Sequence, residues 1–132
     1  MSGTRRLMVL CAVILASACD DGGPGAPAPE PGPLNVVLAT PRDDDGAVMF
    51  SISGGAVDSI TALGYGIFTS QTAHDAHRVV VNGDIVDGPI ARIWVPDRLG
   101  IGAYTLSIEQ VAARGTYEQQ QAAGYVLSLS AP

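Results

Sequence analysis

The amino-acid sequence predicts an all-β domain, an antiparallel β-sandwich of seven or eight short strands, behind an export signal and a linker. Two observations predict this fold. Apolar residues alternate with polar or small ones at a period of two through much of residues 34–132. Clusters of Gly, Pro and Asp interrupt the alternation roughly every 8–12 residues, a spacing typical of the strands of a sandwich.

The first half of the domain has the clearest strand patterns. Residues 34–38 and 48–52 alternate on either side of a polar turn at 41–46, whose sequence is PRDDDG. Residues 57–63 give a weaker strand, and residues 64–69 a stronger one with Gly at its start. We therefore expect four strands before residue 70.

The second half begins with residues 71–77, which predict a polar loop. Residues 78–82 are rich in β-branched side chains and predict a strand. Asn82-Gly83 is the strongest hairpin signal in the chain, because both residue types tolerate positive φ. The remaining expected elements are a short piece at 84–86, strands at 90–95, 103–109 and 125–130, and a helical turn opening with the capping box at 116–119.

Two stretches resemble a known class of module. Residues 46–50 (GAVMF), which leave an acidic turn, and residues 93–97 (IWVPD) are similar to cohesin and other immunoglobulin-like modules of bacterial surface proteins. The resemblance covers most of residues 34–132 and rests on pattern. It implies an immunoglobulin/cohesin-like sandwich and leaves the function open.

Residues 1–18 have the organisation of a secretory signal peptide. Two arginines precede an apolar run of ten residues, which is too short for a bilayer because a spanning helix needs about 20. Small residues follow, and they predict cleavage between Ala18 and Cys19.

The cleavage site, Ala16-Ser17-Ala18-Cys19, resembles the lipobox of bacterial lipoproteins. The resemblance implies that the Cys19 thiol carries a diacylglyceryl group and that Cys19 begins the mature chain. Ala16 departs from the lipobox pattern, which favours Leu at that place. The resemblance therefore implies an exported, lipid-anchored protein of the bacterial cell envelope. The sequence leaves open which membrane leaflet holds the lipid. The alternative is ordinary secretion with a free Cys19 thiol.

The linker, residues 19–33, carries the predicted lipid at Cys19 and is otherwise rich in Pro and Gly. Its composition predicts a disordered or extended polyproline II spacer. The other cysteine of the chain, Cys11, lies in the signal peptide that is removed, so we expect no disulfide in the mature domain.

The formal charge of the whole chain is −6, and removal of residues 1–18 leaves five arginines against thirteen acids, a charge of −8. An acidic domain is not expected to bind nucleic acid, and anionic headgroups repel it. Contact with the membrane should therefore come from the lipid alone.

Two groups of residues carry candidate catalytic or metal chemistry. Asp43, Asp44 and Asp45 are adjacent carboxylates that could help to hold calcium, but they lack the alternating spacing of a calcium loop, and a solvated turn is the favoured interpretation. His74 and His77 have the HxxH spacing of two metal ligands, and the mature chain has no third histidine or thiol to complete a zinc site. We therefore assign no metal, cofactor or catalytic residue.

Arg92 and Trp94 are the candidate partner-binding residues, because Trp and Arg concentrate at interface hot spots and these two share one face of a predicted strand. Packing of the only tryptophan in the core is the alternative. The sequence thus favours a non-catalytic binding or structural module for a protein or glycan partner. Two other hypotheses stay open: a small exported hydrolase or metal-dependent enzyme that uses the His74 and His77 loop, and assembly by strand addition at a sheet edge.

The lipid anchor is tested by replacing Cys19 with serine. We expect the wild-type protein to partition into membranes and to show, by intact mass, a chain starting at residue 19 plus acyl groups. The Cys19→Ser protein should lose both the added mass and the membrane partition. Equal mass increments and equal partition in the two proteins would exclude lipidation at this cysteine.

Overall fold

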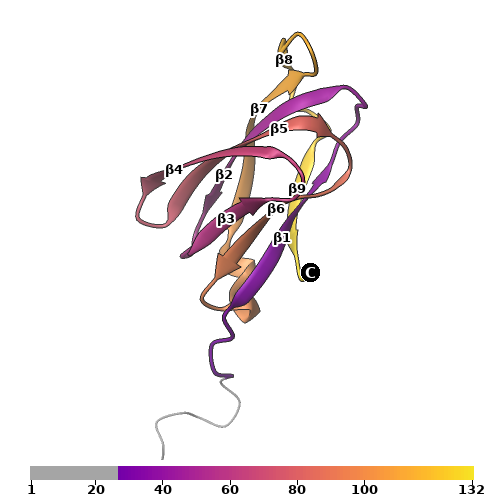
Figure 1. Ribbon diagram of the computed structural model, residues 1–132. Coiled ribbons are helices and arrows are strands. Elements are labelled where there is room, and N and C mark those ends of the chain that lie inside the picture. Colours follow the sequence, from indigo (N-terminus) through magenta and orange to yellow (C-terminus); the bar gives the residue numbers. More distant parts are fainter. Residues whose placement is uncertain (1–26) are drawn as a thin grey trace, which may run out of the picture.

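The computed structural model describes residues 27–132, and the predicted signal peptide, Cys19 and the first part of the linker lie outside the described residues. The described chain forms two antiparallel sheets packed face to face (Figure 1), so the prediction of an all-β antiparallel sandwich is confirmed. It contains nine strands, one more than the upper expectation, because a two-residue strand closes one edge.

The strands divide four and five between the sheets. In spatial order, the first sheet contains β3 (Ser59–Ala62), β6 (Gly88–Val95), β1 (Gly32–Ala39) and β9 (Val126–Ser130). The second contains β4 (Gly66–Ala73), β5 (Ala76–Ile85), β2 (Asp45–Ser53), β7 (Thr105–Ala113) and β8 (Gln119–Gln120). A 3₁₀ helix, η1 (Arg98–Ala103), connects β6 to β7.

The core lies between the two sheets and is built from the inward half of each alternating strand. Leu34, Val36 and Leu38 of β1 are at most 1% exposed, and Phe50 and Ile52 of β2 are fully buried. Burial of each such side chain stabilises the fold by about 1.5–3 kcal/mol. The other core side chains are Val48, Val79, Val81, Ile85, Ile90, Ala91, Ile93, Val95, Val111 and Tyr125.

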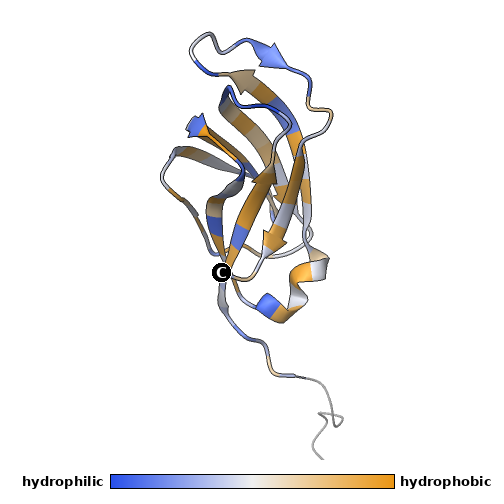
Figure 2. Cartoon of the chain, turned by 90° about the vertical axis from the view of Figure 1, so that its right-hand side faces the viewer, coloured by the Kyte–Doolittle hydropathy of each residue, from blue (hydrophilic) through white to orange (hydrophobic). Residues whose placement is uncertain are grey.

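The chain places its first two strands at inner positions of opposite sheets. β1 pairs with β6 and β9, and β2 pairs with β5 and β7. Most connections therefore cross from one sheet to the other, and within one sheet only β4 to β5 and β7 to β8 join strands that are consecutive in sequence. Figure 2 shows apolar residues recurring along the strands of the sandwich, with the hydrophilic β8 at one end.

The prediction of a hairpin at Asn82-Gly83 is wrong. β5 continues through both residues to Ile85, whose side chain is fully buried. The pairing of β5 with β2 shifts register here, from Ala47 opposite Asn82 to Asp45 opposite Ile85. Gly83, with φ of +140°, accommodates this β-bulge. A glycine with positive φ can serve a bulge as well as a tight turn. The local signal was therefore real, and the strand that pairs with Gly83 decided which of the two forms.

The polar loop predicted at residues 71–77 is also wrong, because β4 and β5 extend to a tight hairpin whose turn is formed by His74 and Asp75. The Gln71 side chain donates to the His74 carbonyl at 3.0 Å. The residues read as a loop because β4 is an edge strand, with the side chains of its second half exposed to water.

The helical turn predicted at residues 116–119 does not form. Gln119 and Gln120 form β8 and pair with Ala112 and Val111 of β7. Two backbone hydrogen bonds close the connection, from the Tyr117 amide to the Ala113 carbonyl and from the Ala113 amide to the Glu118 carbonyl, both at 2.9 Å. The first bond has the i to i−4 spacing of one helical turn, but the second runs in the opposite direction and leads the chain into β8, so no helix continues.

The last residues of the predicted linker are attached to the domain. The Arg98 amide donates to the Glu30 carbonyl at 2.8 Å, and the Glu30 amide donates to the Asp97 carboxylate at 3.1 Å. The guanidinium of Arg98 also pairs with the Glu30 carboxylate. These contacts fix the chain beside η1 where it enters β1, and Figure 1 places this entry at the opposite end of the domain from β8.

The bulge makes Gly83 a sensitive position. A Cβ there would meet the Tyr65 ring at 3.0 Å, in addition to the positive φ. We expect Gly83→Ala to lower the free energy of unfolding by about 1–3 kcal/mol, the strain of a non-glycine residue in such a conformation. Gly102→Ala is the matched control, because a Cβ meets nothing within 4 Å there. Equal denaturant midpoints for the two variants would contradict the role of the bulge.

Candidate functional site

Arg92 and Trp94 lie on the outer face of the four-stranded sheet, as their shared alternation predicts. β6 is flanked by β3 and β1 in this sheet, and its side chains Ile93 and Val95 enter the core. Trp94 consequently points outward and is 46% exposed. The only tryptophan of the chain is therefore not a core residue.

Arg92 is oriented by its neighbours on the adjacent strands. Asn35 of β1 and Thr61 of β3 pair with it in register, one on each side. The Nε of Arg92 donates to the Oδ1 of Asn35 at 3.0 Å, and its side chain is partly buried. Among the described residues, no carboxylate lies within ion-pair distance of Arg92. Its terminal nitrogens therefore combine a fixed position with a charge that remains available to a partner.

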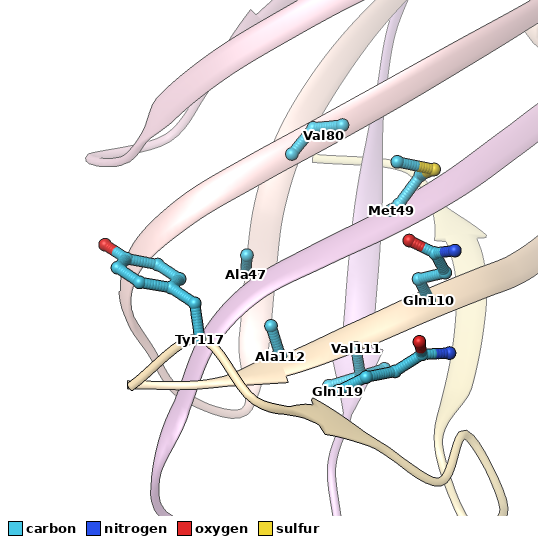
Figure 3. A pocket seen from close by; sticks show the side chains of 8 residues that line it. All are labelled: Ala47, Met49, Val80, Gln110, Val111, Ala112, Tyr117 and Gln119. Carbon is cyan, nitrogen blue, oxygen red and sulfur yellow. The ribbon is translucent and has the colours of Figure 1, made fainter. Parts of the chain in front are cut away.

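A second feature, a hollow of about 230 Å³, lies on the outer face of the five-stranded sheet. Small side chains form its floor, because Ala47 of β2 and Ala112 of β7 are register partners. Met49, Val80 and Tyr117 surround this floor together with two glutamines, as Figure 3 shows. The residues that line it are Ala47, Met49, Val80, Gln110, Val111, Ala112, Tyr117 and Gln119. We call it the Tyr117 groove.

Tyr117 is the one non-glycine residue with positive φ, at 54°, in the part of the chain that the structure describes. Its side chain is nevertheless 64% exposed, so burial does not offset this conformation. The two backbone hydrogen bonds that close the β7–β8 connection hold it in place. Backbone strain of this kind persists where the surrounding structure over-determines it and is frequent at binding sites.

The three adjacent aspartates do not converge. The Asp45 side chain is fully buried, where it accepts hydrogen bonds from the Tyr125 hydroxyl at 2.6 Å and from the Thr40 hydroxyl. Asp44, by contrast, is exposed, and its carboxylate accepts from the Gln120 amide at 3.4 Å. Within residues 27–132, no three Asp, Glu, His or Cys side chains are grouped as a metal ion requires.

The two histidines lie at the β4–β5 hairpin. His74 is in the turn, with a side chain that is 96% exposed and 3.7 Å from the Asp75 carboxylate. His77 is within β5 and pairs with Gln71 of β4 and Ile52 of β2. The structure thus separates them into a turn position and a strand position.

Cys19 and the Ala18–Cys19 cleavage site lie outside the described residues, so lipidation stays a prediction. From residue 27 onward, no helix has the length and apolar character needed to cross a bilayer.

Comparison of the chain with protein-family models, with curated proteins and with solved structures finds no match. The likeness to cohesin and immunoglobulin-like modules therefore stays a prediction, and the arguments for function below rest on the geometry of the two faces.

Sequence reasoning found the Arg92–Trp94 face and missed the Tyr117 groove. The groove combines residues from β2, β5, β7 and the β7–β8 connection, which lie far apart in sequence. Its only local signal was an apolar Met49 and Val80 at outward positions of their strands. Tyr117 itself was hidden in the helical turn that was predicted wrongly.

The contribution of Tyr125 to the stability of the fold should depend on pH, because its hydroxyl is hydrogen-bonded to the buried Asp45. Burial, followed by the hydrogen bond to Asp45, raises the pKa of Tyr125 to about 12 from its ordinary value of 10.0. As the pH rises, Tyr125 therefore loses its proton at a lower pH in the unfolded chain than in the folded protein. The contribution of this hydroxyl to the free energy of unfolding is complete below pH 10 and declines as the pH rises from 10 towards 12.

Tyr125→Phe leaves the buried carboxylate with one donor fewer, and we expect a loss of about 1–3 kcal/mol in unfolding free energy at neutral pH. The difference between wild type and variant, measured by urea unfolding, should narrow between pH 10 and 12. A difference that is constant over this range would contradict the assigned pKa.

Proposed function

We propose that this protein is a lipid-anchored protein of the bacterial cell envelope whose β-sandwich is a non-catalytic binding module for a protein or glycan partner. The observation that carries the proposal is the outward-facing Trp94 beside an oriented Arg92, on a strand flanked on both sides by other strands. An exposed tryptophan and an arginine without an acidic partner are the side chains most often found at the centre of a binding interface.

The rigidity of the site supports the same conclusion. β6 is held by backbone pairing to β1 and β3 along the stretch that contains Arg92 and Trp94. The hydrogen bond from Arg92 to Asn35 selects one orientation of the guanidinium group. Less conformational entropy is therefore lost when a partner binds, which is how a preorganised surface gains affinity.

The charge of the surroundings favours a carboxylate or hydroxyl acceptor on the partner. The residues that pair with Arg92 and Trp94 across β1 and β3 are Pro33, Asn35, Ser59 and Thr61, all uncharged. Arg92 is thus an isolated cation on a polar, neutral face of an acidic domain. A planar acceptor can bond to its terminal nitrogens while an apolar group covers the Trp94 ring.

The proposed anchor agrees with the way the chain enters the domain. Glu30 is bound next to η1, and Gly32, the first residue of β1, pairs with Val95 beside Trp94. The Arg92–Trp94 face therefore begins at the end of the domain where the linker enters.

The experiment is affinity capture from envelope extracts with the full mature chain as bait. A partner should be retained by the wild type and lost by the Trp94→Ala/Arg92→Ala variant, with an affinity lowered at least tenfold. Both substitutions replace outward side chains, so circular dichroism should show an unchanged fold. Capture that is equal in wild type and variant, or absent from both, would overturn this assignment of the face.

His74→Ala/His77→Ala is the matched control and also tests the alternative, a small exported hydrolase or metal-dependent enzyme. If the domain is a binding module, this variant should capture the partner as well as the wild type does, because the β4–β5 hairpin belongs to the other sheet. Hydrolytic activity that is present in the wild type and lost in this variant would favour the enzyme.

A further inference from the structure

The Tyr117 groove is an uncharged surface framed by ion pairs. Arg78 of β5 and Glu109 of β7 form one pair, with 2.7 Å between Nε and Oε2, across the Ser51 position of β2. Arg114 and Asp84 form another at 3.2 Å, near the first residues of β2. No Asp, Glu or Arg is among the groove-lining residues. The charges of these four side chains are thus matched within the protein, whereas the exposed Glu118, between Tyr117 and Gln119 in sequence, forms no ion pair within the described residues. Complementarity therefore favours a neutral ligand over an anionic one.

The groove has an aromatic wall and an amide wall. Figure 3 shows the Tyr117 ring on one side of Ala47 and Ala112 and the side chains of Gln110 and Gln119 on the other. Each primary amide offers a donor and an acceptor, and both glutamines are exposed. A ligand lying on the alanine floor therefore meets an apolar ring face and two groups that bond to hydroxyls in either direction.

The size of the groove favours a small unit over a protein surface. Eight residues line it, whereas one side of a stable protein interface contains about 20–30 residues. A hollow with few polar groups on a mostly apolar lining is typical of a small-molecule site. A sugar ring fits this chemistry, because its C–H face is apolar and its rim carries hydroxyls that act as donors and acceptors.

We propose that the Tyr117 groove binds a sugar unit of a neutral glycan, with the Tyr117 ring against the sugar face and the Gln110 and Gln119 amides on its hydroxyls. The inference rests on the proposed function in that it treats the domain as a binding module. It uses the opposite sheet from Arg92 and Trp94, so the two sites can fail separately.

The groove also explains the conformation of Tyr117. A strained, exposed aromatic side chain contributes little to the core, and its ring is placed beside the hollow by the turn that strains it. A ligand that stacks on the ring gains from this placement, because the backbone of the turn is already fixed by its hydrogen bonds before binding.

The test uses the full mature chain with Cys19→Ser, titrated with cellotriose, maltotriose and triacetylchitotriose as neutral probes and trigalacturonate as an anionic one. We expect at least one neutral probe to bind with a dissociation constant of about 1 mM or tighter. The ¹H–¹⁵N shifts should move at Gln110, Ala112 and Gln119, and trigalacturonate should move none of them.

Three variants separate the role of the ring from effects on the fold. Tyr117→Gly removes the ring and relieves the positive φ, so it should fold at least as well as wild type while losing about tenfold or more in affinity. Tyr117→Phe keeps the ring and should bind within about threefold of wild type. Ala112→Leu fills the floor and should abolish binding without removing any contact group.

Each other outcome overturns the inference. The inference fails if none of the three neutral probes binds, if the protein prefers trigalacturonate, or if Tyr117→Gly binds the sugar with unchanged affinity. Trp94→Ala is the matched aromatic control on the opposite sheet and should bind the sugar normally. Sugar binding that is lost in Trp94→Ala and kept in Tyr117→Gly would overturn the groove and leave the proposed function standing.

Discussion

The face-to-face packing of β1 against β2 is the constraint on which the other features depend. The two strands take inner positions in opposite sheets, and every other strand except β3, β4 and β8 pairs with one of them. Their inward residues, such as Val36 and Phe50, are fully buried. The period of two then fixes what faces water: burial of Val48 and Phe50 turns Ala47 and Met49 outward, where they form the floor and side of the Tyr117 groove. The same rule acting on Ile93 and Val95 turns Trp94 outward. Both candidate sites are therefore consequences of how the core is made.

The buried Asp45 shows how the end of the sandwich near β8 is closed. Asp45 is the first residue of β2. Its carboxylate accepts hydrogen bonds from the hydroxyls of Thr40, just after β1, and Tyr125, just before β9. The three segments belong to both sheets, so one side chain links them across the core. A buried carboxylate is stable only with such donors, and this use of Asp45 separates it from its exposed neighbour Asp44. The place of Asp45 in the acidic turn is thus explained by these two hydrogen bonds.

The sequence predicted the all-β sandwich and the approximate positions of most strands, because alternation records which side of a strand is buried. It also identified Arg92 and Trp94 as residues of one face. It failed where a local signal has two outcomes that only a distant partner separates. Gly83 could serve a hairpin or a bulge, and its pairing opposite the start of β2 selected the bulge. The Tyr117 turn had a helical capping pattern, and the exposed strand edge of β7 offered its residues a competing set of hydrogen bonds. The groove required register across β5, β2 and β7, which no single stretch of sequence contains.

The two faces differ in chemistry and in their position along the domain. The Arg92–Trp94 face carries a cation that forms no ion pair within the described residues. It begins where the linker enters, since Gly32 pairs with Val95. The Tyr117 groove is neutral and lies toward the opposite end, next to β8 (Figure 1). Glu30 and Arg98 hold the start of the domain, so the linker must leave from the η1 end. The proposed lipid anchor would therefore be joined to the end of the domain that is opposite β8. The Tyr117 groove lies on the outer face of one sheet and Arg92 and Trp94 lie on that of the other, so a glycan in the groove and a partner on the Arg92–Trp94 face would not compete for the same surface.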